Sequence, residues 1–509
     1  MKRIKILLPL VALSLFSCSD YLDVNTSPNN PQMENVPPRL VLPGAQSSTF
    51  RTQAITMNQL GNVFMNNWAA NVNSFTGGYS REFALTIDNA FYNGIWDGLY
   101  RGTANFDAII KSDLPNQENY KAIAMIMKSY YMQYIVDLYG DSPYSEAFMG
   151  QANLTPSYDN DQDTYVALVD QLDEAVAMID SAPAEAEVVG TEDVMLGGNM
   201  ANWKKFANTI KMRLLLRQSE LAATDATVDA YVDAEFAELA ASTDGFITAS
   251  VTINPGYSKS TNDNQNPFYG AFGYSAAGVA TQNFSFIRAS KYAGDFLNGN
   301  LANTVPDGRR GRIYALVAGS VVGVEQGADS APEALSTLGA SLIPALGSGN
   351  DATVGSSMNG YVMTLSEAKF LEAEAILRGY LGGSAKTVFE AGISASFALH
   401  GVAASAPAYL TAANLQSGLG WDASATDDDK LKAIMTQKWI ALNGIHAIES
   451  YIDMTRTGYP AVPLALTAAY TTKPKRLIYP VSEYVGNSAN VPSITQQQAF
   501  TQGPFWYVP

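Results

Sequence analysis

The side chains that most often carry enzyme chemistry are scarce in this sequence. Its two histidines, His400 and His446, are interpreted as packing or surface residues, because nothing around them resembles a metal-ligand set. Its one cysteine, Cys18, can form neither a zinc–thiolate cluster nor an internal disulfide. GxSxG, Walker A and strand-linked GxGxxG motifs are absent. The sequence therefore gives no sign of nucleophilic, zinc-dependent or nucleotide-dependent catalysis, and we predict no enzyme.

Carboxylates are the one catalytic residue type in good supply, with 48 Asp and Glu. A glycosidase needs two of them about 5 Å or about 6.5–9.5 Å apart, and order along the chain does not report that distance. Asp137 and Asp141 flank a predicted helix end, which favours capping and turn formation. A secreted glycoside hydrolase is kept as an alternative. No cofactor is predicted; the Asp- and Asn-rich turn 261–266 would permit a structural calcium ion, which nothing else supports.

Aromatic and amide side chains gather in two segments with little helical periodicity. An aromatic ring offers a flat apolar face on which a sugar ring can stack, while amides bond its hydroxyls. This mixture predicts a site that holds a polar, uncharged ligand without cleaving it. The candidate ligand-binding residues are Trp68, Asn71, Phe75, Tyr79, Asn266, Phe268, Tyr269 and Phe272. The alternative is that these rings pack loops onto helices, and Trp68 shares an expected helical stripe with Leu60 and Phe64.

The N-terminus has the pattern of a secretory signal peptide. Three cations within the first five residues precede an apolar run, 6–16, that is shorter than the roughly 20 residues of a membrane span. The run ends in Leu15-Phe16-Ser17-Cys18, which resembles a bacterial lipobox. We therefore predict a signal peptide over 1–17, lipidation at Cys18 and a tether over 18–37. More than one acyl chain gives a stable anchor. An ordinary signal peptide with an incidental cysteine is the alternative.

Composition and charge narrow the partners. Apolar residues make up 47% of the chain and charged ones 16%, which is typical of a globular protein. The formal net charge of −17 disfavours nucleic acid and anionic lipid surfaces as partners. Contact with a membrane is thus expected through the lipid anchor only.

Apolar periodicity predicts helices that position the candidate residues. We expect an all-α fold of tetratricopeptide-like helical hairpins with a large loop-rich insertion carrying few short strands. A single domain, 38–509, would comprise a helical scaffold over about 38–242 and 361–445 and a loop-rich ligand-binding half over about 243–360. The tail from 445 is expected to be irregular and to join the loop-rich half. So long a loop region inside a compact protein is usually functional.

Several stretches resemble the SusD/RagB family of outer-membrane nutrient-binding lipoproteins, and they occur in the family's order. The matching stretches are "CSDYLDVNTSPNNP" (18–31), "LYGDSPYSEA" (138–147), "NWKKFANTIKMRLLLR" (202–217), "SEAKFLEAEAILRG" (366–379), "IMTQKWIALNG" (434–444), "RTGYP" (456–460) and "KRLIYPVSEYVGN" (475–487). They span nearly the whole chain after residue 17. No motif in them supplies ligand-binding residues.

The resemblance implies a lipid-anchored protein on the outer membrane, facing the cell exterior. It implies a partner, a SusC-like TonB-dependent transporter, over which the protein lies as a lid. Asp20 and Asp23 look like the family's signal for export to the outer face. The implied ligand is an oligosaccharide or polysaccharide, which is captured and not cleaved; a peptide-binding member of the same family is the alternative. A helical-repeat adaptor that binds only a protein is a third hypothesis.

Overall fold

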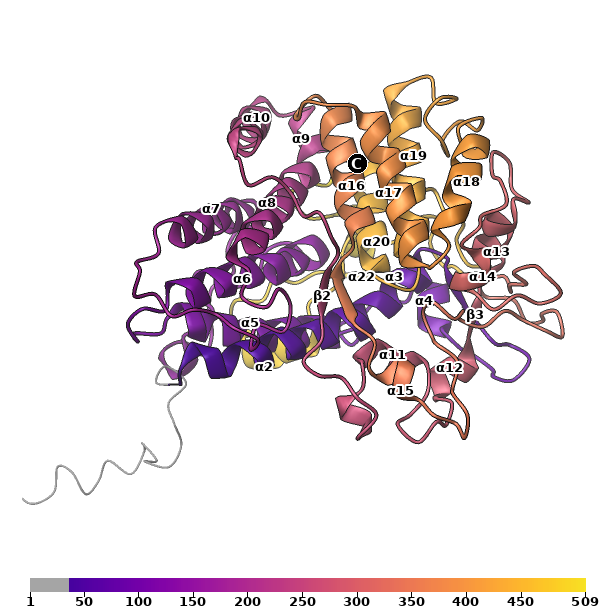
Figure 1. The fold of residues 1–509 in the computed structure, drawn as a ribbon, viewed down its shortest axis with the longest axis horizontal. Helices are drawn as coiled ribbons and strands as arrows, with labels where there is room; N and C mark the ends of the chain where they lie inside the picture. Colours follow the sequence, from indigo (N-terminus) through magenta and orange to yellow (C-terminus); the bar gives the residue numbers. More distant parts are fainter. Residues whose placement is uncertain (1–35) are drawn as a thin grey trace, which may run out of the picture.

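The computed structural model describes residues 36–509, and Figure 1 shows their arrangement. The predicted signal peptide, the lipidation at Cys18 and nearly all of the predicted tether lie outside the described residues. None of the helices between residues 36 and 509 combines the length and the apolar character that a membrane span requires.

Helices dominate the first half of the chain. They are α2 (Pro38–Thr52), the π-helical turn η2 (Gln53–Met57), α3 (Asn58–Phe64), α4 (Ser80–Ala84), α5 (Gly94–Ile110), α6 (Glu118–Tyr139), η3 (Gly150–Ala152), α7 (Asp161–Asp180), α8 (Met200–Arg217), α9 (Ser219–Ala222) and α10 (Ala226–Ala241). Short helices within long loops follow: η4 (Asn262–Asn264), α11 (Pro267–Phe272), α12 (Gln282–Phe286), α13 (Lys291–Asn298), α14 (Arg310–Ile313) and α15 (Thr353–Ser356). The last helices are α16 (Leu365–Leu377), α17 (Ala385–Leu399), η5 (Ala403–Ser405), α18 (Ala406–Ala413), α19 (Asp427–Leu442), α20 (Ala447–Thr457), α21 (Val481–Gly486) and α22 (Gln496–Thr501).

The long helices pack as neighbouring hairpins. α5, α6, α7 and α8 follow one another in space, and α16 packs against α8, α17 and α19 (Figure 1). α6 is buried on all sides from Ala122 to Tyr139, as expected of a helix that is apolar all round. It ends at Gly140, whose φ of +75° few other residues adopt. The side chain of Asn160 caps α7 by accepting from the backbone N–H of Gln162 and Asp163.

Two small antiparallel sheets join distant loops. β1 (Trp68–Ala70) pairs with β3 (Ile287–Ala289), with Trp68 opposite Ala289. β2 (Val251–Ile253) pairs with β4 (Gly360–Met363). The prediction of a mostly helical fold with few short strands is confirmed. Trp68 itself lies in β1 and not on the helical stripe expected from its spacing, because α3 ends at Phe64 and the chain turns before Trp68.

Helix α20 corrects the expectation of an irregular tail after residue 445. Its charged residues Glu449, Asp453 and Arg456 are all buried. The buried face of α20 is therefore not marked by apolar residues, which are what helical periodicity in a sequence detects. These side chains are paired with charges from other helices, which removes the cost of burying them alone. The helical scaffold therefore continues to Thr457.

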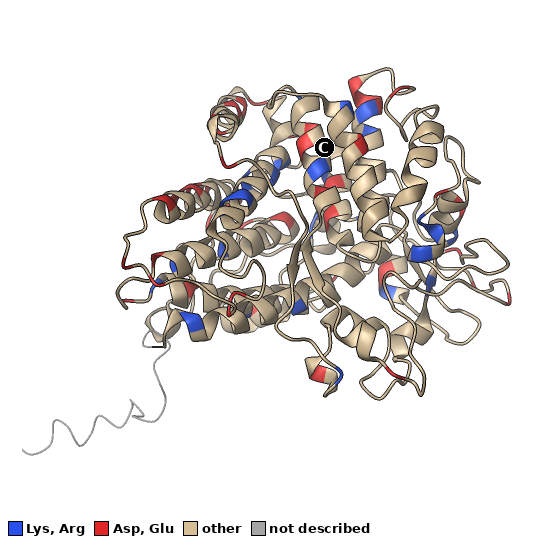
Figure 2. Ribbon diagram, in the orientation of Figure 1, with Lys and Arg blue, Asp and Glu red and all other residues tan. Residues whose placement is uncertain are grey.

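An ion-pair network lies inside the scaffold, where Figure 2 shows basic and acidic residues side by side on the central helices. Arg217 on α8 contacts Glu449 at 2.6 Å and Asp453 at 2.7 Å, both on α20. Arg213 contacts Glu367 on α16 at 2.5 Å, and Lys438 on α19 contacts Asp453 at 2.8 Å. The network thus ties together four helices far apart in sequence.

Candidate functional site

The β1–β3 pair brings together two aromatic loop segments that are about 200 residues apart. The backbone N–H of Asn71, directly after β1, donates to Phe286 O at 2.8 Å. The ring of Phe286 then meets Phe75 edge-on, with centroids 5.4 Å apart, and Tyr79, with centroids 4.9 Å apart. All three rings are half-buried. We call Phe75, Tyr79 and Phe286 the aromatic patch.

Glycine makes this contact of rings achievable. A Cβ on Gly78 would lie 2.2 Å from ring carbons of Phe286, so only a residue without a side chain fits under that ring. Gly77 has a φ of +70°, and Tyr79 adopts +54°, a left-handed conformation that is uncommon for a bulky residue. Such local strain is typical of functional loops. The chain thus turns sharply at 77–79 and presents Tyr79 beside Phe286.

Polar groups flank the patch. Asn73 is exposed and donates to Pro332 O at 2.8 Å, which brings the loop around residue 332 alongside. Arg288 on β3 is half-buried and donates from Nη1 to Ile287 O at 2.7 Å. Burial lowers the pKa of Arg288 from its ordinary value, and no carboxylate pairs with it between residues 36 and 509. α11 and α12 carry no charged residue (Figure 2). Rings beside amide and guanidinium donors suit a ligand rich in hydroxyls.

The other six candidates are buried and are not part of the patch. Trp68, Tyr269 and Phe272 are fully buried and Phe268 nearly so, and the rings of Trp68 and Phe272 meet at 5.2 Å. Phe268, with Asn266, also lines a cavity between α11, η2 and the loop 341–361. The two asparagines serve the backbone. Asn266 Oδ1 caps α11 by accepting from Tyr269 N at 3.0 Å, and Asn71 Nδ2 donates to Ser285 O at 3.3 Å.

Two of the eight candidate residues, Phe75 and Tyr79, belong to the aromatic patch, and their role in binding stays a prediction; Phe286 and Arg288 were not among the candidates. Both missed residues lie in "TQNFSFIR" (281–288), which has the same mixture of aromatic and amide residues as the two segments that were singled out. What the sequence does not reveal is the β1–β3 pairing that sets this segment against loop 71–79.

The carboxylates considered for catalysis have structural partners. Asp137 accepts from Trp506 Nε1 at 2.9 Å and pairs with Arg217 at 3.4 Å. Burial raises the pKa of Asp137 to about 6, against the opposing effect of Arg217. Asp141 accepts from the backbone N–H of Asp161, as a turn residue does. These acids stabilise the junction of α6, α7 and α8.

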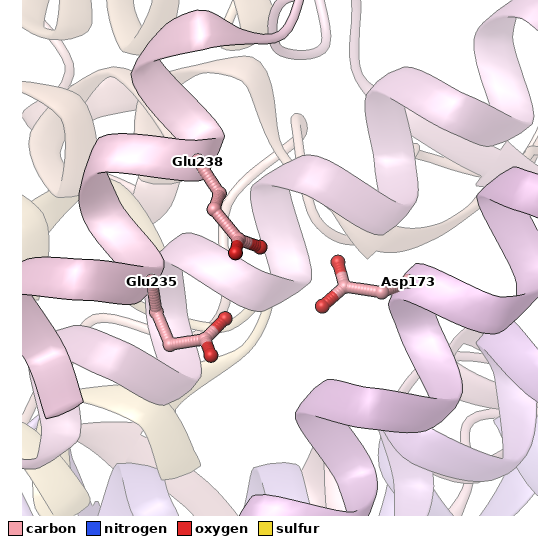
Figure 3. A group of neighbouring side chains, drawn as sticks. All are labelled: Asp173, Glu235 and Glu238. Carbon is pink, nitrogen blue, oxygen red and sulfur yellow. The ribbon is translucent and has the colours of Figure 1, made fainter.

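One group of three acids in the described part of the chain is close enough to surround a cation. Figure 3 shows Asp173, Glu235 and Glu238 converging from α7 and α10. Lys211 Nζ already lies among them, at 2.7 Å from Asp173, 2.7 Å from Glu235 and 3.7 Å from Glu238. The lysine ammonium supplies the positive charge, so the group needs no metal. The turn 261–266 is not part of such a group within residues 36–509.

Comparison with known proteins gives a consistent result. A SusD-like family profile, described as starch-binding and associating with the outer membrane, matches residues 28–480. A chitin-binding SusD homolog from Flavobacterium johnsoniae is 25% identical, with a TM-score of 0.70 over 91% of this chain and 96% of its own. A SusD-like protein from Bacteroides thetaiotaomicron is 25% identical, with a TM-score of 0.69 over 92% and 98%.

A SusD homolog from Parabacteroides distasonis, 21% identical, shares the fold with a TM-score of 0.73 over 92% of this chain and 98% of its own. None of the curated proteins is similar to this chain in sequence. The matches cover almost the full length of the solved structures.

Proposed function

Because the chain belongs to the SusD-like family of non-catalytic, outer-membrane nutrient-binding proteins, we propose that it captures oligosaccharides at the aromatic patch for uptake. A SusC-like TonB-dependent transporter would receive the ligand. Lipidation at Cys18 would hold the protein on the outer membrane, facing the cell exterior. The secreted glycoside hydrolase is set aside, since the family binds and does not cleave its ligand.

The aromatic patch carries this proposal. The three rings are half-buried and packed against one another, so they lose little side-chain freedom when a ligand contacts the part that solvent reaches. Asn73, two residues before Phe75, is exposed and can accept from a hydroxyl through Oδ1, and Arg288, two residues after Phe286, is half-buried and can donate to one. No acid–base pair is needed for such capture.

The first ligands to test are N-acetylglucosamine oligomers, because one relative at 25% identity is described as chitin-binding. Maltooligosaccharides follow from the family description of starch binding. Calorimetric titration of the protein with both series and with a mixture of short peptides distinguishes the ligand classes. Heat from peptides alone would replace the oligosaccharide with a peptide as the ligand.

The patch is tested with Tyr79→Ala and Phe286→Ala. Each is expected to weaken oligosaccharide binding at least tenfold, which corresponds to about 1.4 kcal/mol. Tyr380→Ala is the matched control, because Tyr380 is also a half-buried ring stacked on another, Phe236 at 4.5 Å, but lies on the helical scaffold. Unchanged affinity in both patch variants would show that the ligand binds elsewhere.

A further inference from the structure

A second feature shares no residue with the aromatic patch: a pocket with exposed apolar side chains on the segments that form it. The pocket has a volume of about 520 Å³ and lies between the first turns of α5, the loop 143–156 and α21. Leu154 lines it and is 74% exposed, and Met149, Val481 and Val485, which are 48%, 43% and 79% exposed, each adjoin a lining residue in sequence. Exposed apolar side chains that gather around a pocket indicate an interaction site. We call this surface the α5–α21 pocket.

The floor of the pocket is rigid and aromatic. The rings of Trp96 and Tyr100 are 4.7 Å apart, and Tyr100 contacts Phe148 at 5.9 Å. Glu483 holds the floor together, because its carboxylate accepts from Trp96 Nε1 at 3.2 Å and from Tyr158 Oη at 2.7 Å. Phe148 has a φ of +61°, which places its ring at the pocket wall despite the backbone strain. The cavity therefore exists before anything binds.

The charges at this pocket are mostly unpaired and negative. Asp97 and Glu483 line the pocket, and neither forms an ion pair within residues 36–509. The adjoining loop adds Glu146 and Asp159, whose oxygens accept from backbone N–H groups and meet no cation in the same part of the chain. Arg101 is the one basic side chain lining the pocket. The surface thus favours a partner that carries positive charge.

Aliphatic side chains such as Leu154 and Val485 neither stack with a sugar as a ring does nor bond its hydroxyls. A rim of this kind, around a preformed pocket, fits instead the anchor side chain of a protein partner. We propose that the α5–α21 pocket docks a protein segment that inserts an apolar side chain and sets a Lys or Arg beside Asp97 and Glu483. The segment belongs to the transporter, so this inference rests on the proposed function.

The pocket and the aromatic patch share no residue. Capture of ligand and attachment to the partner would then depend on different side chains. That separation makes the proposal testable, because variants in the pocket should leave ligand affinity unchanged.

The test uses the full-length lipoprotein, tagged and co-expressed with the SusC-like transporter of its own organism. The variant Leu154→Asp with Val485→Asp adds charge at two exposed sites, and we expect at least tenfold less transporter to co-purify. The control is Val188→Asp with Leu415→Asp, two side chains that are 84% and 74% exposed and lie outside the pocket. Asp97→Asn is expected to give a smaller loss and to weaken the dependence of retention on salt.

The outcomes test the docking proposal separately from the proposed function. Retention of the transporter by the pocket variant at the wild-type level, or an equal loss in the control, overturns the docking proposal and leaves the proposed function intact. If the wild-type protein retains no transporter, the partner in the proposed function is wrong and the docking proposal falls with it. Oligosaccharide titration of the same variants reports separately on capture.

Discussion

The ion-pair network of the helical scaffold and the surroundings of the aromatic patch use polar groups in opposite ways. In the scaffold, charges are buried and paired across helices, as Arg217 is with Glu449 and Asp453. Beside the aromatic patch, Arg288 is half-buried and meets backbone carbonyls, and the short helices α11 and α12 carry no charge. Elsewhere in the loop-rich half, Arg309 is buried and paired with Asp307 at 2.7 Å, as in the scaffold. The first arrangement fixes the relative positions of helices. The arrangement beside the patch leaves N–H groups of Arg288 near half-buried rings, where a ligand can bond to them.

The largest predicted effect lies in the scaffold. Arg217→Met leaves Glu449, Asp453 and Asp137 buried with less compensating charge, and we expect the free energy of unfolding to fall by about 3–5 kcal/mol. Denaturant unfolding followed by circular dichroism measures the change. Lys386→Met is the control, because the Lys386–Asp422 pair is exposed and such pairs contribute about 0–1 kcal/mol. Equal losses in the two variants would show that the buried pairs of Arg217 contribute no more to stability than an exposed pair does.

The second prediction concerns His400, which lies where the helical scaffold contacts the loop-rich half. Its Nδ1 lies 2.8 Å from Ser341 Oγ, across from α17 to the loop-rich half. Burial, with smaller effects from Arg309 and Arg312, lowers the pKa of His400 to about 3. In the unfolded chain His400 is protonated near pH 6.5, whereas in the folded chain it stays neutral down to about pH 3. The free energy of unfolding therefore decreases as the pH falls below 6.5.

Between pH 7 and pH 5 this difference costs the wild-type protein about 2 kcal/mol. His400→Asn has no such proton to take up, so its unfolding free energy should fall by that much less over the same range. Thermal and denaturant unfolding at the two pH values measure the difference. If the unfolding free energy of the two proteins changes equally with pH, His400 does not contribute to the pH dependence of stability.

The sequence predicted the scaffold better than the site, for physical reasons. Helices such as α6 and α19 depend on local spacing, and their bounds follow from residues such as Gly140 and Thr426. α20 was not predicted, because a sequence does not distinguish charged residues that are buried and paired from those that are exposed. The patch depends on the non-local pairing of β1 with β3. Local composition therefore pointed to Phe75 and Tyr79 as candidates, and for Trp68 it is the alternative of core packing that the structure bears out.

The smallest predicted effect tests whether the ring of Phe286 contacts the ligand. In Gly78→Ala the new methyl group would lie 2.2 Å from ring carbons of Phe286, so the ring must move away from Tyr79. Because overpacking of this kind costs about 1–3 kcal/mol and displaces only a loop ring, we expect a modest loss of stability and a larger loss of oligosaccharide affinity. Gly44→Ala is the control, since its Cβ meets nothing within 4 Å. Calorimetric affinity that stays at the wild-type value while the ring is displaced, as seen in a crystal structure of the variant, would mean that Phe286 supports the loop and does not contact the ligand.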